Sequence, residues 1–253
     1  MFNFFKSKTT IAELITPGFI DIHSHILPGI DDGAKNTSDS VQLLSEFQQL
    51  GFSKVIGTPH TYKGVHDNTN ASIKSSFDRL NEQDLPNVVI GYASEYMLDF
   101  SLFERIENKS LLTVKDNFVL VEMSYVSKPT HLFDLIFKLK VNGYIPVMAH
   151  PERYRFLFDD FNQYKILQDR GCLFQLNLLS ITGYYGYDVL KIADKLLKNN
   201  LINFVGSDVH HQRHIACIKG NLKTKKFDSS VLISALKELE NAIENNAFFS
   251  KNS

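Results

Sequence analysis

Residues 19–33 read FIDIHSHILPGIDDG, a short apolar run that ends in two histidines and continues into a polar loop. The run predicts a buried β-strand over about 19–23. Because side chains alternate between the two faces of a strand, His23 and His25 point the same way. Two imidazoles on one face, at the end of a buried strand, form a pair of candidate metal ligands. The rest of the chain decides whether this pair belongs to a larger site.

The composition favours one large soluble domain. The chain has 253 residues, of which 43% are hydrophobic, and a net charge of −1. It has no long basic run of the kind that binds nucleic acid and no apolar stretch near the roughly 20 residues of a membrane span. Cys172 and Cys217 are far apart in the sequence and form no C-x-x-C motif. This cysteine usage predicts no disulfide framework and a cytoplasmic location.

The N-terminal residues precede the domain. Residues 1–18 are expected to form a lead-in that closes with the breaker pair Pro17-Gly18, followed by a single domain over 19–253. The first eight residues, MFNFFKSK, are too short for a signal peptide and lack its cleavage region. They are expected to dock on the domain or to fray. A role on a membrane surface is the alternative, although short apolar ends bind membranes poorly.

Short apolar runs alternate with helical patterns along the whole chain. This alternation indicates βαβ units and a parallel sheet. Seven such units in this length favour one incomplete or distorted (β/α) barrel over two domains. Strands are predicted at about 19–23, 53–58, 88–94, 117–121, 145–149, 172–176 and 203–206. Helices are predicted at about 37–50, 71–83, 100–107, 130–142, 161–170, 186–199 and 229–246.

Histidines and carboxylates follow the predicted strands. They are His23, His25, His60, Glu95, Glu122, His150, Asp208 and His210. The C-terminal ends of parallel barrel strands share one rim, which carries the active site. A lone histidine at a strand end usually packs in the core, but packing does not explain eight such side chains. Buried carboxylates cost several kcal/mol unless cations pair with them, so this pattern predicts a multinuclear metal site.

The types of ligand in this site indicate which metals it binds and which reaction it supports. Histidines and carboxylates without a thiolate suit manganese, iron or zinc. Glu95 is a natural bridging ligand, because the two oxygens of a carboxylate can face two cations. Metals roughly 3.5–4 Å apart lower the pKa of a bridging water and clamp the attacking and leaving oxygens of a phosphoryl transfer.

Several segments carry a family resemblance: DIHSHILPGIDDGA (21–34), TPH (58–60), the strand-end Glu95, VEM (121–123), AHPER (149–153) and SDVH (207–210). They resemble the PHP (polymerase and histidinol phosphatase) superfamily. More narrowly, they are similar to the bacterial metal-dependent protein-tyrosine phosphatases of capsule and exopolysaccharide operons, the CpsB type. The resemblance covers about residues 19–246 and implies a distorted (β/α)7, TIM-like barrel with a trinuclear site.

The resemblance also implies which residues hold each of three divalent metal ions. The first set is His23, His25, Glu95 and Asp208. The second set is Glu95, Glu122 and His150, and the third is Asp31, His60 and His210. In other branches of the superfamily, histidines stand where this chain has Asp31 and Glu122. Carboxylates favour harder ions, so Mn²⁺ is expected, with iron and zinc as alternatives.

Arginines and aromatic residues near these motifs are candidates for substrate contacts. Arg153 and Arg213 are the expected phosphate clamps, because a guanidinium offers paired donors to phosphate oxygens. The loop after His210 is shorter than the loop of the family. Further candidates are the tyrosines of 183–187, Tyr62 and Tyr125 as rim residues, and His211 and His214 as proton donors.

Cysteine catalysis is excluded, because neither cysteine is followed by the arginine of a C-x5-R phosphate loop. The chain is therefore expected to hydrolyse protein phosphotyrosine, with a bacterial tyrosine kinase tail of capsule or exopolysaccharide synthesis as partner. The alternatives are a phosphatase for a small molecule such as histidinol phosphate, and a module that only binds the kinase tail. A homo-oligomer is left open.

Overall fold

The strand predicted at 19–23 forms as β1 (Phe19–Ser24), and all of its residues are buried. The computed structural model of the protein describes residues 10–220, 239–240 and 242–250. The expected docking or membrane role of the first eight residues therefore lies outside the described residues. Residues just after them pack on the core, since Ile11, Leu14 and Ile15 are buried.

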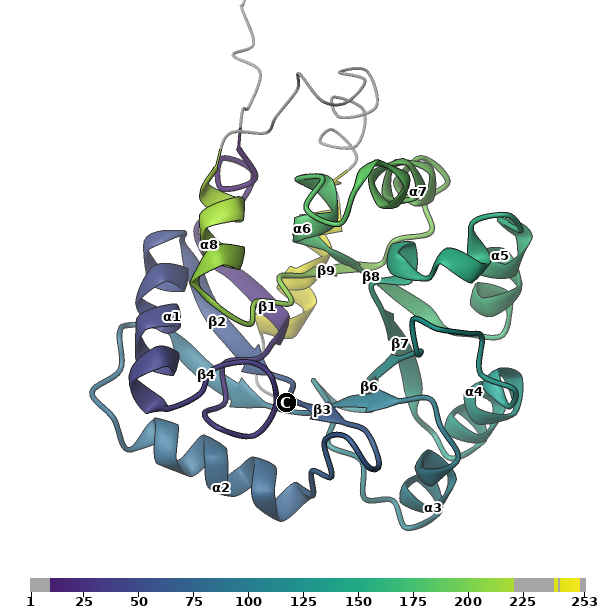
Figure 1. The fold of residues 1–253 in the computed structure, drawn as a ribbon, viewed down its shortest axis with the longest axis horizontal. Coiled ribbons are helices and arrows are strands. Elements are labelled where there is room, and N and C mark those ends of the chain that lie inside the picture. The colour runs from purple at the N-terminus through teal and green to yellow at the C-terminus, as the bar shows by residue number, and fades with distance from the viewer. Residues whose placement is uncertain (1–9, 221–238, 241, 251–253) are drawn as a thin grey trace, which may run out of the picture.

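The strands are arranged around a ring, with helices on the outside (Figure 1). All strand pairs are parallel, as the alternation of strands and helices predicted. One sheet has the order β1-β2-β4, with β2 at Phe52–Gly57 and β4 at Val89–Tyr92. The other has the order β3-β5-β6-β7-β8-β9. Its strands are His60–Thr61, Glu95–Met97, Phe118–Glu122, Ile145–Ala149, Leu173–Asn177 and Phe204–Gly206.

The two sheets meet at a break that the sequence pattern did not predict. β2 and β3 are separated by Thr58 and Pro59, and β4 and β5 by Ala93 and Ser94. Single hydrogen bonds continue across the break: Ala93 N donates to Gly57 O at 2.8 Å, and Glu95 N donates to Pro59 O at 3.1 Å. Proline has no N–H for a sheet ladder, which is one reason why pairing stops there.

A second junction lies between β1 and β9. Asp208 N donates to His23 O at 2.8 Å, and His25 N donates to Val209 O at 2.9 Å. Further along β1 and β9, the buried side chain of Asn246 takes the place of hydrogen bonds between the two strands. It donates to Ile20 O and Val205 O and accepts from Val205 N. The described strands thus form two parallel hydrogen-bonded sheets and no closed sheet, where the sequence predicted one incomplete or distorted barrel.

The predicted helices form close to their expected positions. They are α1 (Thr37–Gln49), α2 (Asn70–Asn81), α3 (Ser101–Glu107), α4 (Leu132–Val141), α5 (Asn162–Asp169) and α7 (Tyr187–Lys198). Two short helices, α6 (Leu178–Ile181) and α8 (Gln212–Lys219), were not predicted from the sequence. α8 forms where a loop was expected after His210. Most of the predicted helix at 229–246 lies outside the described residues.

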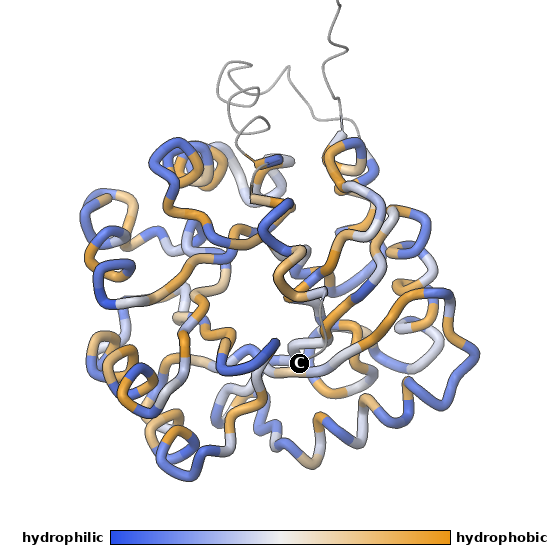
Figure 2. Tube along the Cα trace, turned by 180° about the vertical axis from the view of Figure 1, so that it is seen from behind, coloured by the Kyte–Doolittle hydropathy of each residue, from blue (hydrophilic) through white to orange (hydrophobic). Residues whose placement is uncertain are grey.

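Apolar residues fill both sides of the strand ring. Figure 2 shows hydrophobic residues along the strands and an alternation of polar and apolar residues around the helices. The larger cluster lies between strands and helices, and a smaller one lies inside the ring, including Ile22, Leu120 and Val147. Phe249, in the short 3-10 helix η4 (Asn246–Ser250), belongs to this inner cluster and lies 4.9 Å from the Phe204 ring. The inner core leaves the other end of the ring for polar side chains.

Candidate metal centre

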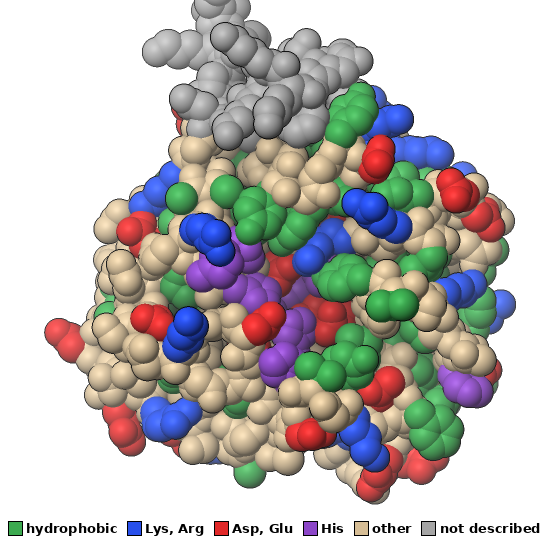
Figure 3. Space-filling model, in the orientation of Figure 1, with side chains coloured by type: hydrophobic (Ala, Val, Ile, Leu, Met, Phe, Trp, Pro, Cys, Tyr) green, Lys and Arg blue, Asp and Glu red, His purple; other side chains and the backbone are tan. Residues whose placement is uncertain are grey.

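The C-terminal ends of the strands bring the predicted histidines and carboxylates together. Figure 3 shows histidines and acidic side chains in a hollow at the centre of this face, bordered by Lys and Arg. His23 lies in β1, His60 and Glu95 begin β3 and β5, and Glu122 ends β6. His25 and His150 come directly after β1 and β7, and Asp208 and His210 come two and four residues after the end of β9.

The four side chains of the first predicted set lie close to one another. Nε2 of His23 and Nε2 of His25 are 3.3 Å apart. Glu95 Oε2 lies 3.2 Å from the first nitrogen and 3.5 Å from the second. Asp208 Oδ1 lies 3.3 Å from both. His23, His25 and Glu95 form one candidate metal group, and Asp208 belongs to a second group with His23 and His150.

Glu95 lies at the centre of the whole cluster. Its Oε1 is 3.2 Å from His150 Nε2, and its Oε2 is 3.1 Å from His60 Nδ1. Glu122 Oε1 is 2.8 Å from the same nitrogen of His60. Glu122 therefore groups with His60 and Glu95, whereas the sequence had grouped it with His150. His150 groups with His23 and Asp208.

The third set differs from the expectation at its aspartate. Asp32, not Asp31, groups with His60, His210 and His25, within a cluster whose ligand atoms lie within 4.8 Å of one another. Asp32 Oδ1 is 3.6 Å from His60 Nε2 and 3.4 Å from His210 Nε2. Asp31 Oδ2 instead lies 2.7 Å from Nδ1 of His25, the ring nitrogen that faces away from Glu95. Two adjacent aspartates in a loop offer no sequence signal that distinguishes these roles.

Polar residues behind the cluster fix the imidazoles. Gln175 Oε1 lies 2.7 Å from Nδ1 of His23, and Asp31 Oδ2 lies at the same distance from Nδ1 of His25. Such partners hold Nε2 of each ring toward the cluster and set its tautomer. Gln175 sits inside an apolar strand, and sequence analysis did not single it out.

The donor set fits divalent metal ions. Glu95 is fully buried, yet neither of its carboxylate oxygens has a hydrogen bond among the described residues, and the same holds for Nδ1 of His60. Burial opposes the ionisation of Glu95, but the imidazoles of His23 and His60 outweigh it and hold its pKa well below the usual range. An ionised, buried carboxylate without hydrogen bonds is costly unless cations face it. Divalent cations satisfy these oxygens and nitrogens with the ligand types they prefer.

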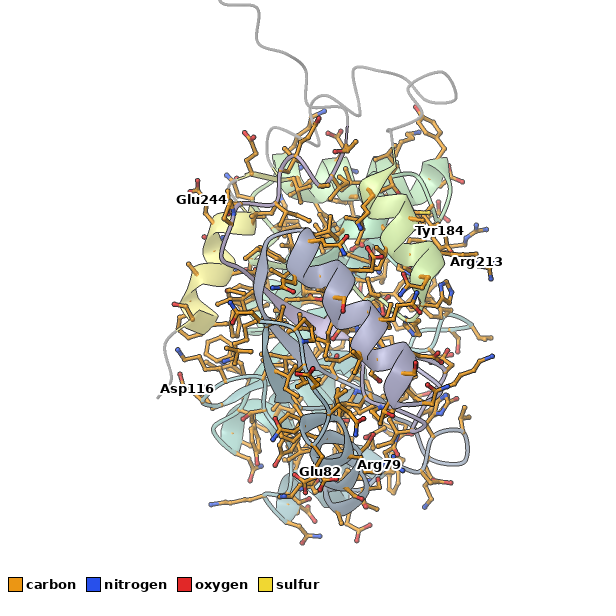
Figure 4. The ribbon with its side chains drawn as sticks, turned by 90° about the vertical axis from the view of Figure 1, so that its left-hand side faces the viewer. Arg79, Glu82, Asp116, Tyr184, Arg213 and Glu244 are labelled. Atoms are coloured by element: carbon orange, nitrogen blue, oxygen red, sulfur yellow. The ribbon has the colours of Figure 1, made fainter. Side chains whose placement is uncertain are left out.

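The two predicted phosphate clamps have different surroundings. Arg153 Nη1 donates to Asp208 Oδ2 at 2.7 Å, and its guanidinium lies over the rings of Tyr185 and Tyr125, 4.0 and 4.7 Å from their centroids. Arg213 is exposed and lines a cavity of about 600 Å³ that borders the cluster at Asp32 and His210. Figure 4 shows Arg213 projecting from the same end of the molecule as Tyr184, opposite to Asp116 and Glu244.

Of the remaining candidate residues, His214 and His211 lie beside the site and Tyr62 lies elsewhere. Nδ1 of His214 accepts a hydrogen bond from His210 N at 3.2 Å, and burial lowers the pKa of His214 to about 3. A neutral imidazole that accepts this bond is a poor proton donor. His211 packs against His214, with ring centroids 4.0 Å apart. Tyr62 lines a different cavity, between α3 and α4.

Neither cysteine is placed for catalysis. Cys172 is buried, and burial raises the pKa of its thiol to about 12. Both cysteines are free, and neither lies in the cluster. Across the described ranges, no helix has both the length and the apolar character needed to cross a membrane.

Comparisons with known proteins agree with this geometry. Residues 19–224 match the family described as "Capsular polysaccharide synthesis, CpsB/CapC". The tyrosine-protein phosphatase YwqE of Bacillus subtilis is 31% identical over 224 residues, which cover 87% of this chain and 84% of YwqE. The tyrosine-protein phosphatase CpsB of Streptococcus pneumoniae is 30% identical over 201 residues, which cover 76% of this chain and 83% of CpsB.

The fold is similar as well. A chain from the crystal structures of YwqE and CpsB, described as unique metal-dependent tyrosine phosphatases, superimposes with a TM-score of 0.75 at 29% identity. The superposition covers 92% of each chain. The similarity therefore extends over nearly the whole molecule, including the strands that carry the cluster.

Proposed function

Since this chain belongs to the CpsB/CapC family of capsular polysaccharide synthesis proteins, we propose that it is a metal-dependent phosphatase that hydrolyses phosphotyrosine in proteins. The observation that carries the proposal is Glu95, a buried carboxylate that has no hydrogen bond among the described residues and faces four imidazoles, in a cluster whose Asp208 is paired with Arg153. Such a centre suits the transfer of a phosphoryl group to water.

The proposal includes three divalent ions, with Mn²⁺ as the expected metal. His23, His25, Glu95 and Asp208 would hold the first ion. Glu95 and Glu122 would hold the second together with His150, which lies 3.2 Å from Glu95 Oε1, although Glu122 lies nearer to His60 in this structure. Asp32, His60 and His210 would hold the third, with Asp32 in the place first assigned to Asp31. Bound divalent ions supply water that deprotonates near neutral pH and positive charge beside the phosphoryl oxygens.

Residues around the ions set the protonation state of one ligand and hold one phosphate donor in place. Burial and the adjacent Arg153 lower the pKa of His150 to about 4, so its imidazole is neutral, the form that binds metals. Arg153 is fixed by Asp208 and by two tyrosine rings, so little of its side-chain freedom is lost when a phosphate binds. Its second guanidinium edge is the donor we assign to the phosphoryl group. A phenolate, with a reference pKa of about 10, is a fair leaving group and needs no strong acid.

Three wider aspects belong to the same proposal. The two sheets are the two parts of a distorted (β/α)7 barrel within one domain over 19–253. The substrate is the phosphorylated tail of a bacterial tyrosine kinase of capsule or exopolysaccharide synthesis, in accord with the family description. The reaction takes place in the cytoplasm, in line with the two free cysteines.

The test is turnover of a phosphotyrosine peptide by the full chain loaded with Mn²⁺. We expect phosphate release that stops on addition of a chelator, returns with Mn²⁺, and exceeds release from a matched phosphoserine peptide. A metal-replete protein that leaves phosphotyrosine peptides intact would refute the proposal. Higher kcat/KM on histidinol phosphate than on every phosphotyrosine peptide would assign the same chemistry to a small-molecule substrate.

A further inference from the structure

A small pocket adjoins the metal centre on the side of Arg153. Its volume is about 230 Å³, and it is lined by Tyr125, Arg153, Arg155, Tyr185 and Val189. Arg153 connects it to the cluster through its ion pair with Asp208. Cavities for drug-sized ligands begin at about 300 Å³, so this pocket suits a single amino-acid side chain.

The pocket carries positive charge that no described residue neutralises. Arg153 is paired with Asp208, but Arg155 has no ion pair with any residue that the structure describes. Arg155 is exposed, and no carboxylate is among the five residues that line the pocket. An unpaired guanidinium at the mouth of a pocket attracts anions and matches the two oxygens of a carboxylate.

The walls of the pocket restrict what that anion is attached to. The rings of Tyr125 and Tyr185 flank the Arg153 guanidinium, and Val189 is 4% exposed and offers an apolar surface. An apolar wall beside a cation suits a short side chain with one or two methylene groups and a terminal carboxylate. Aspartate and glutamate have this shape.

We propose that this pocket, with Arg155 as its cation, binds an acidic residue adjacent to the phosphotyrosine of the protein substrate. The enzyme then prefers phosphotyrosines that have aspartate or glutamate as neighbours. This inference rests on the proposed function, because the pocket acts on the substrate of the same centre. Arg155 is a specificity residue that touches the flanking side chain and not the reacting phosphoryl group.

The experiment compares three phosphotyrosine peptides that differ only in having Glu, Gln or Lys on both sides of the phosphotyrosine. p-Nitrophenyl phosphate, which has no flanking residues, reports on the centre itself. For the Mn²⁺-loaded wild type we expect kcat/KM about fivefold higher on the Glu peptide than on the Gln peptide, through KM. Arg155→Gln should abolish this preference and leave hydrolysis of p-nitrophenyl phosphate unchanged. Arg155→Glu should reverse it in favour of the Lys peptide.

Arg170→Gln is the matched control, because Arg170 is also exposed and its guanidinium lies over the Phe133 ring, at 4.2 Å, away from the cluster. This variant should keep the preference for the Glu peptide. Equal wild-type kcat/KM on the three peptides, or a preference that survives in Arg155→Gln, would overturn the inference but leave the proposed function intact. No turnover of any peptide by metal-loaded protein would overturn both.

Discussion

The carboxylate of Asp31 lies 2.7 Å from Nδ1 of His25, while Nε2 of the same ring faces Glu95 and Asp208. Asp31 thus contacts the centre through the imidazole of His25 and the backbone N–H of His60, and its neighbour Asp32 faces the imidazoles of His60 and His210. The loop between β1 and α1 therefore serves the cluster twice, once by orienting an imidazole and once by offering an oxygen.

This division predicts different metal losses for two adjacent substitutions. Asp32→Asn should remove the ion at His60 and His210 and keep the ion at His23 and His25. Asp31→Asn should weaken metal affinity by about 10–100-fold, because it disturbs the orientation of a ligand without removing one. Titration of metal-free protein with Mn²⁺, followed by elemental analysis, measures both effects. Equal stoichiometry and affinity in the two variants would contradict the assignment.

Metal binding should stabilise the fold. The cluster joins residues from both sheets, and Glu95 at its centre has no hydrogen bond among the described residues. We therefore expect Mn²⁺ to raise the melting temperature of chelator-treated protein, with an effect that grows with metal concentration above the Kd. Differential scanning fluorimetry measures the shift. Glu95→Gln serves as the control, since its response to Mn²⁺ should be much smaller than that of the wild type.

Arg153 and Arg213 should differ in their importance for catalysis. Arg153→Lys keeps the charge but loses the planar group that stacks on two tyrosines and pairs with Asp208. We expect kcat/KM for p-nitrophenyl phosphate to fall about 100-fold, a loss of roughly 3 kcal/mol of transition-state stabilisation. Arg213→Lys should cost less than about tenfold, because Arg213 is exposed at the side of the cluster. If Arg213→Lys lowers kcat/KM more than Arg153→Lys does, Arg213 is the main phosphate clamp and Arg153 is not.

Both cysteines should be dispensable. Burial raises the pKa of Cys172 to about 12, so its thiolate is scarce throughout the pH range 6–9 and the group should resist alkylation in the native state. The double variant Cys172→Ala, Cys217→Ala should keep kcat/KM within about twofold of the wild type, since neither thiol belongs to the reaction. Loss of turnover in a double variant that still binds Mn²⁺ would contradict the metal-based mechanism.

Asn246 offers a test of the junction between β1 and β9. Its side-chain amide makes three hydrogen bonds to the two strands in a buried position. Asn246→Leu has a similar volume but leaves those backbone groups unpaired, so we expect a loss of about 2–4 kcal/mol in the free energy of unfolding. Chemical denaturation measures it. Exposed Asn245→Ala removes one hydrogen bond, to Asn203 O, and should cost under about 1 kcal/mol.

The positions of the site residues at the strand ends could be predicted from the sequence. The alternation of side chains along a strand and the common direction of parallel strands are enough to place them. His23 and His25 share a face, and the residues after β7 and β9 reach the same rim. The choice between Asp31 and Asp32 lay beyond that reasoning, because a loop has no periodicity. The break at Pro59 was missed for a similar reason, since one apolar run continued up to it.

The partners of the centre were hardest to predict. Gln175 reads as one polar residue in an apolar strand, and only the fold brings it to His23. α8 was mistaken for a loop because its residues 212–219 mix basic, polar and small side chains. Its apolar positions, Ile215 and Ile218, are too few to give a clear helical pattern.

The position of the cluster across the two sheets has a consequence for synthesis of the protein. During translation, β1, β2 and β4 can pair once residue 92 has left the ribosome, but this sheet carries only His23 of the cluster. Asp208 and His210 follow more than a hundred residues later. A nascent chain therefore exposes an unfinished ring until its last strand docks. Tight metal binding is therefore expected only after Asp208 and His210 have been synthesised, and chains truncated before these residues should lack bound metal.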